Sequence, residues 1–197
     1  MGAKSTNRIW YLALVGLGAL ILVSGLITLQ PFGPPLTWVI RGAALVGYLT
    51  VFLTIISSAY MRELVRIFDR PFIRVHHILA VTGLFLVTFH PLGVALNNAT
   101  LLVFLPKLDS LKVFLQLGGR PAWYLILAAS LAALLRKTLI KKGWRTIHFL
   151  NYIAFWLATV HAIMIGTDFQ YIIMKVLAVV MAVVILGVFI QKRRKRR

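Results

Sequence analysis

The chain has 197 residues, of which 60% are hydrophobic and only 13% are charged, and its formal net charge is +18. A soluble globular domain is about 45–50% apolar and about 25% charged, so this composition excludes an ordinary soluble domain. Cysteine is absent, which excludes disulfides, iron–sulfur clusters, thiolate zinc sites and covalently attached c-type haem.

Six apolar runs fill nearly the whole chain. A helix needs about 20 largely apolar residues to cross the hydrocarbon core of a bilayer. In chain order the runs span residues 9–29, 36–60, 75–96, 121–135, 146–166 and 171–190. The fourth run is short, and Leu139 and Ile140 can extend it. We therefore predict an all-α membrane protein: one domain over residues 1–197, built as a six-transmembrane-helix bundle.

Basic residues lie in alternate connections, on one side of the predicted membrane. That side receives 17 of the 22 lysines and arginines, in the N-terminal residues, the connections 61–74 and 136–145, and the tail 192–197. The positive-inside rule places this side in the cytoplasm, and an even number of spans agrees. We therefore predict cytoplasmic termini and a multi-pass protein of the plasma membrane, in a prokaryotic cell.

The basic tail 192–197 would suit nucleic-acid binding in a soluble protein. Directly after a transmembrane helix, it is better explained as a cytoplasmic topology anchor that also contacts anionic lipid. We therefore expect membrane lipid, and no nucleic acid, among the partners.

On the opposite side, the long connection 97–120 contains an apolar pattern that predicts a short helix, lying as a lid on the outer surface.

All five histidines fall in the third and fifth predicted spans. Ionisable side chains are costly inside a bilayer and usually mark a functional site. His76 and His148 each lie just inside the cytoplasmic end of their span. His90 follows His76 by 14 residues and His161 follows His148 by 13, distances of about 21 Å and about 19.5 Å along a helix.

The two spans run parallel because one helix separates them. His76 should therefore lie level with His148, and His90 level with His161. Two helices that each present a histidine at the same depth can hold a haem iron by bis-imidazole ligation. These four histidines are the candidate axial ligands of two haems, which would form an electron path across the bilayer.

The helical geometry leaves a choice open. Fourteen residues fall about 40° short of four full turns, so His76 and His90 share a helix face. Thirteen residues fall about 140° short, so His148 and His161 need a kink, a bulge or haems approached from different sides. His77 has the 13-residue spacing to His90 and is an alternative ligand, or a hydrogen-bond donor to a haem propionate.

Two interpretations without haem also remain. The histidines can be structural, making interhelical hydrogen bonds in a transporter or scaffold. They can also bind zinc or another metal ion in transit. Against the second, the chain has only four acidic residues, all in predicted loops, whereas a cation pathway normally contains carboxylates.

The histidine segments resemble the ferric-reductase-like transmembrane domain superfamily. The resemblance rests on RVHHIL from residue 74, HPL from residue 90, and W-R-x-x-H-x-x-x-Y from residue 144 leading to His161, and it covers roughly residues 36–166. The superfamily includes ferric reductases, the membrane halves of NADPH oxidases and the haem-binding subunit of the periplasmic methionine sulfoxide reductase system. It implies two b-type haems, with His76 paired to His148 and His90 to His161.

Chain length and the region after the last helix distinguish members of the superfamily. Ferric reductases and NADPH oxidases carry a flavin- and nicotinamide-binding region after the last helix, and no G-x-G-x-x-G fingerprint follows a strand here. In length and span number the chain is similar to the methionine sulfoxide reductase subunit, which passes electrons to a periplasmic enzyme. That subunit tends to lack the first histidine of the third helix, whereas this chain has His76 and His77.

The expected function is therefore a membrane b-type cytochrome that carries electrons to the outer side. It would be an electron-transfer subunit of an oxidoreductase system rather than a complete enzyme. The expected partners are a separate donor, a reductase or quinol, and an outer acceptor protein or metal chelate. A quinone or a flavin is a further candidate cofactor. The alternative within this chemistry is the membrane subunit of a ferric or other metal-chelate reductase.

Three arginines are further candidates for cofactor binding. Arg41, near the outer end of the second span, can meet an outer-haem propionate or extend to the outer interface. Arg145 shares a helix face with His148 and can meet the inner propionates, or act only as a cytoplasmic topology charge. Arg74 has the same two interpretations.

Overall fold

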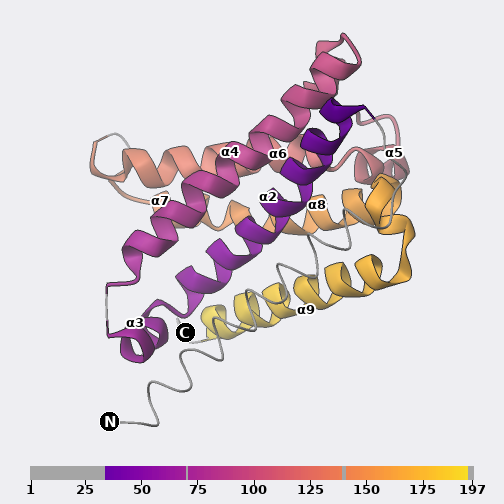
Figure 1. Cartoon of the computed structure of the whole chain (residues 1–197). Helices are drawn as coiled ribbons and strands as arrows, with labels where there is room; N and C mark the ends of the chain where they lie inside the picture. Colours follow the sequence, from indigo (N-terminus) through magenta and orange to yellow (C-terminus); the bar gives the residue numbers. More distant parts are fainter. Residues whose placement is uncertain (1–33, 70, 139–140, 195–197) are drawn as a thin grey trace.

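A computed structural model gives the fold of residues 34–69, 71–138 and 141–194 (Figure 1). The described part is all helical, without a strand, and this confirms the predicted all-α class for it. The predicted span 9–29 lies outside the described residues. The fold is therefore built here from the second predicted span onward.

In the described part of the chain, four helices are long and apolar enough to cross a membrane, as the predicted membrane protein requires. They are α2 (Pro35–Ala59), α4 (Ile73–Asn97), the helical segment Trp144–Ile165 and α9 (Ile172–Arg194). The segment Trp144–Ile165 consists of α7 (Trp144–His148) and α8 (Leu150–Ile165). These bounds agree closely with four of the six predicted runs.

The fourth predicted run forms a shorter helix. It folds as α6 (Gly119–Leu134), whose 16 residues span about 24 Å, and continues as the 3₁₀ turn η2 (Leu135–Lys137). The hydrocarbon core is about 30 Å thick, so α6 alone is shorter than a perpendicular span. Leu139 and Ile140, the predicted extension, lie outside the described residues. The described part thus contains four candidate spans, and the bundle of six stays a prediction.

The most extensive helix contact is between α2 and α4, which lie side by side (Figure 1). Glycines allow this close approach, as in many membrane helix pairs. A Cβ atom at Gly93 would lie 2.5 Å from Ile40 Cγ1, and one at Gly47 would lie 3.1 Å from Leu86 Cβ. The α2–α4 pair is consequently a tightly packed unit, with the histidines of α4 held against it.

Small residues also bring α6 against α8. Ala122, Ala129 and Ala154 are almost completely buried, and Ala122 and Ala154 share a core cluster with Ile126. The helix α9 contacts both α8 and α2, where Phe155, Met181 and other apolar side chains form a second cluster. The histidine-bearing helices are thus connected through α2 and α6.

Short elements join the long helices at the two ends of the molecule. At one end, α3 (Met61–Phe68) links α2 to α4. At the other end lie η1 (Leu101–Phe104), α5 (Leu111–Gln116) and η3 (Thr167–Gln170). The side chain of Ser110 caps α5 by accepting a hydrogen bond from Val113 N–H at 3.2 Å. The short helix predicted within 97–120 is confirmed, and it packs against α8.

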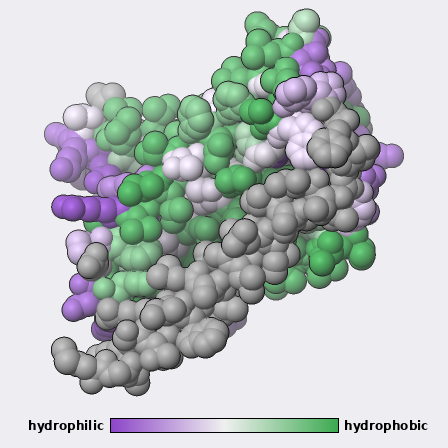
Figure 2. Space-filling view, in the orientation of Figure 1, coloured by the Kyte–Doolittle hydropathy of each residue, from purple (hydrophilic) through white to green (hydrophobic). Residues whose placement is uncertain are grey.

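Hydrophilic side chains gather at the two ends of the molecule, with a largely hydrophobic band between them (Figure 2). Many apolar side chains in this band are exposed, including Val81 at 69% and Ile173 at 63%. Such a surface suits contact with lipid chains rather than water.

Candidate functional site

His76 and His148 line one pocket near the end of the molecule that carries α3 and α7. Helix α4 supplies His76 and α7 supplies His148, and their imidazoles lie within range of an electrostatic interaction. Space not filled by atoms amounts to about 550 Å³, the open side of the pocket included. The polar side chains that line it besides the histidines are Thr54, Ser58, Ser130, Asn151 and Tyr152.

The adjacent His77 has a different environment. Its side chain is exposed and is not part of the pocket lining, although its ring centroid lies 5.9 Å from that of His76. Successive residues point about 100° apart on a helix, so only one of the two can face His148 directly. The structure gives that position to His76.

His90 and His161 form the second pair, at the end of the molecule that carries α5 and η3. Both side chains are partly buried, and their imidazoles lie within range of an electrostatic interaction. Helix α4 again supplies one member and α8 the other. The structure thus brings His76 near His148 and His90 near His161, and haem ligation by these pairs stays a prediction.

Each of the four imidazoles makes a hydrogen bond through Nδ1 to an oxygen of the protein. The distances from Nδ1 are 3.2 Å to Ile40 O for His90, 2.6 Å to Gln116 O for His161, and 3.1 Å to Ala129 O for His148. A carbonyl only accepts, so these three rings carry their proton on Nδ1. The amide nitrogen of Asn151 is 3.5 Å from His148 Nδ1, too far to compete with the Ala129 carbonyl.

The fourth imidazole follows the same pattern through a hydroxyl. His76 Nδ1 lies 3.3 Å from Ser57 Oγ, and Ser57 donates its own proton to Thr54 O at 3.0 Å. Because the serine has a single hydroxyl proton, its oxygen acts as the acceptor for His76 N–H. In their neutral form all four rings therefore leave Nε2 unprotonated, which is the form in which a histidine binds a metal.

The helix that carries His148 and His161 is interrupted between them. Helix α7 ends at His148, α8 begins at Leu150, and the N–H of Phe149 bonds to the carbonyls of Arg145 and Thr146, both at 3.2 Å. This break changes the angular relation expected for a straight helix. Whether a kink, a bulge or a separate approach of the two haems meets the 13-residue spacing stays a prediction.

His161 is tightly enclosed by the start of α6. A Cβ atom at Gly119 would lie 2.9 Å from His161 Nε2 and 2.8 Å from Cδ2. Arg120 lies within range of an electrostatic interaction with the same ring, and its Nη1 donates to Leu105 O at 2.6 Å. The Nε2 edge of His161 thus lies directly against Gly119, where any larger residue would clash with the ring.

Arg41 has a partner that sequence analysis did not consider. Its guanidinium donates to both carboxylate oxygens of Asp168 in η3, with Nε 3.2 Å from Oδ2, and it lies 5.6 Å from the ring of Trp38. The two charged side chains are only 15% and 11% exposed. The guanidinium is thus already paired with Asp168. A contact between Arg41 and a haem propionate stays a prediction.

The other two arginines lie at the opposite end. Arg145 is exposed and stacks over Trp144, with Cζ 5.4 Å from the ring centroid. Arg74 is exposed on the first turn of α4. Neither position decides between a propionate contact and a cytoplasmic topology charge.

Sequence analysis missed Ser57, Asp168 and Arg120. Asp168 could have been found from the sequence, because it is the one charged residue in the connection after the fifth run and lies at the same predicted membrane level as Arg41. Ser57 and the carbonyl acceptors had none, since backbone carbonyls and serines are common to every helix.

Within the described ranges, no group of three or more His, Cys, Asp or Glu side chains could hold a bare metal ion. Comparison with family models, with curated proteins and with solved structures finds no significant match. The two histidine pairs are therefore the features that point to a function.

Proposed function

We propose that this chain is a membrane b-type cytochrome that carries electrons across the bilayer through two bis-histidine haems. His76 and His148 would hold the inner haem, and His90 and His161 the outer haem. The chain would serve as an electron-transfer subunit in a prokaryotic plasma membrane, with both termini in the cytoplasm.

One observation carries the proposal: the Nδ1 hydrogen bonds of the four histidines. Histidines that bind a metal almost always donate the other ring N–H to a carbonyl, carboxylate or water, which fixes the ring and raises its basicity. Here three rings donate to Ile40, Ala129 and Gln116 carbonyls, and His76 donates to Ser57. Four partly buried rings with the same free nitrogen are better explained by ligation than by four unrelated interhelical hydrogen bonds.

The pocket beside His76 and His148 supports the inner site. Apolar side chains such as Ile55, Leu84 and Ile126 line it together with the two histidines. Apolar walls with a few placed polar groups suit a flat, largely apolar macrocycle. When bound, haem supplies a one-electron carrier, and the protein sets its potential through the axial ligands, nearby charges and burial.

The pairs lie near opposite ends of the hydrophobic band, which supports transfer across the bilayer. The inner pair lies at the end that carries the basic residues Arg62, Arg66 and Arg74, and the outer pair lies beside α5 and η3. A donor, either a reductase or a quinol, would deliver electrons at the inner end. An outer protein or a metal chelate would receive them.

Haem stoichiometry in matched variants tests the proposal. The purified protein should give a b-type reduced-minus-oxidised spectrum, and a pyridine haemochrome assay should give about two haems per chain. His148→Ala should remove the inner haem and His161→Ala the outer one. His77→Ala is the matched control, because His77 is exposed on the same helix as two of the ligands, and it should keep both. Full haem content in both ligand variants would overturn the pairing.

A further inference from the structure

We infer that the Arg41–Asp168 ion pair sets the geometry and reduction potential of the outer haem site as a charge-neutral clamp. This inference rests on the proposed function. It assigns Arg41 and Asp168 as positioning residues, which act on His90 and His161 through the elements that hold them.

The pair joins the two supports of the outer histidines. Arg41 directly follows Ile40, whose carbonyl accepts the Nδ1 proton of His90 at 3.2 Å. Asp168 lies in η3, directly beyond the end of α8, the helix that carries His161. A bond between Arg41 and Asp168 therefore ties the support of His90 to the helix of His161.

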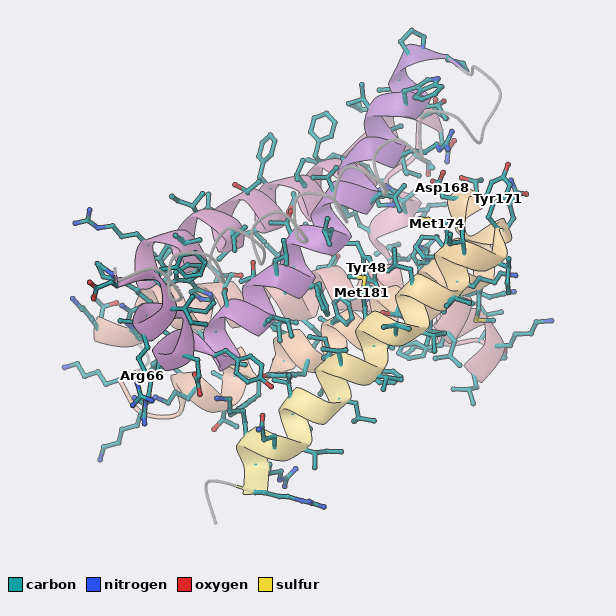
Figure 3. The ribbon with its side chains drawn as sticks, turned by 60° about the horizontal axis from the view of Figure 1, so that its bottom comes forward. Tyr48, Arg66, Asp168, Tyr171, Met174 and Met181 are labelled. Carbon is teal, nitrogen blue, oxygen red and sulfur yellow. The ribbon has the colours of Figure 1, made fainter. Side chains whose placement is uncertain are left out.

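The residues next to Arg41 and Asp168 in the chain are firmly packed. Ile40 is 7% exposed and packs against Gly93, where no larger residue fits. Phe169, next to Asp168, is 6% exposed and belongs to a core cluster with Leu45, Met174 and Ala178. Figure 3 shows Asp168 close to Met174 and Tyr171, at the end of the molecule remote from Arg66. Movement of either charged side chain would thus be transmitted to packed backbone.

The charge balance of the pair matters as much as its geometry. Arg41 and Asp168 are the one salt bridge among the described residues, and both are largely buried. In such surroundings an uncompensated charge acts strongly on a nearby redox centre. A lone cation stabilises the reduced state, which carries one more electron, and a lone anion destabilises it. Together the two charges nearly cancel.

This balance predicts shifts of opposite sign. Asp168→Asn leaves Arg41 uncompensated, so the midpoint potential of the outer haem should move to a more positive value. Arg41→Gln leaves Asp168 uncompensated, so the same potential should move to a more negative value. The double variant Arg41→Gln/Asp168→Asn should return towards the wild-type value. The inner haem should keep its potential in all three.

Potentiometric titration of the purified holoprotein, followed by absorbance, is the test. Asp109→Asn is the matched control, because it removes one carboxylate from an exposed loop on the same side and should shift neither haem. Shifts of the same sign in both single variants, or no shift, would overturn the clamp. A purely structural pair would loosen the site in both variants alike.

A second readout does not require haem. The thermal unfolding of the wild type, the two single variants and the double variant forms a double-mutant cycle, and the clamp predicts a non-zero coupling between the two residues. If the wild type binds no haem but the coupling is present, the proposed function fails while the Arg41–Asp168 link stands. If haem is bound and the coupling is zero, the clamp fails alone.

Discussion

The imidazole of His161 is fixed on two sides: Nδ1 donates to Gln116 O at 2.6 Å, and the Cδ2–Nε2 edge lies against Gly119. The carbonyl belongs to the last residue of α5 and the glycine to the first residue of α6. The outer connection therefore determines which nitrogen of His161 is free and what can reach it.

Replacement of Gly119 by alanine should block the outer site. The added methyl group would lie 2.9 Å from Nε2 of His161, so the ring would have to turn away from its ligating position. We expect the haem content of Gly119→Ala to fall from about two per chain to about one, measured by pyridine haemochrome. Gly42→Ala is the control, because open space surrounds Gly42 and both haems should remain. Equal haem content in the two variants would contradict the role given to the close packing of Gly119 on the Nε2 edge of His161.

The hydroxyl of Ser57 should strengthen haem binding at the inner site by orienting His76. Ser57→Ala removes the hydroxyl that lies 3.3 Å from His76 Nδ1 and leaves the Thr54 backbone as the partner of the ring, so the ring is oriented less firmly. Loss of such a supporting partner typically weakens metal binding about 10–100-fold. Haem titration of the apoprotein should show this loss at the inner site alone. Ser58→Ala, which changes the neighbouring serine of the pocket lining, should bind haem nearly as the wild type does.

The α2–α4 contact should be sensitive to a single methyl group at Gly93. Gly93→Ala places Cβ 2.5 Å from Ile40 Cγ1, and such overpacking typically costs about 1–3 kcal/mol. Circular dichroism during thermal unfolding in detergent should show a lower midpoint. At Gly187, where open space surrounds the helix, alanine should raise stability by roughly 0.5–1 kcal/mol. A Gly93→Ala variant as stable as the wild type would be inconsistent with the tight α2–α4 packing.

The absence of cysteine makes the predicted orientation directly testable. Asp109→Cys lies in the connection between η1 and α5, and Lys142→Cys lies between η2 and α7. A membrane-impermeant maleimide should label Asp109→Cys in intact cells and Lys142→Cys only after permeabilisation. The reverse labelling pattern would show that the chain has the opposite orientation, and the proposed direction of electron transfer would then be wrong.

The sequence predicts most of the helices that carry the histidines and the spacing of the histidines along them. Apolar length alone locates α2, α4 and α9, because lipid contact demands a long uninterrupted run, and rise per residue alone gives the two levels of His76 with His148 and His90 with His161. These relations depend on local composition and spacing, which a single sequence contains.

Other features depend on tertiary contacts and could not be predicted in this way. No proline or glycine marks the break at Phe149. The choice of His76 over His77 depends on the rotation of α4 against its neighbours. The pairing of Arg41 with Asp168 joins residues 127 positions apart. The shortness of α6 was visible in its apolar run, but Leu139 and Ile140 made an extension plausible.

The decisive measurement is the reduced-minus-oxidised absorbance spectrum of the detergent-purified protein, with haem counted by pyridine haemochrome. Two bis-histidine sites should give a b-type spectrum with about two haems per chain, and a loss of one haem in each of His148→Ala and His161→Ala. A chain purified from haem-supplied cells without any haem would contradict the account and leave the four histidines as structural residues of a transporter or scaffold.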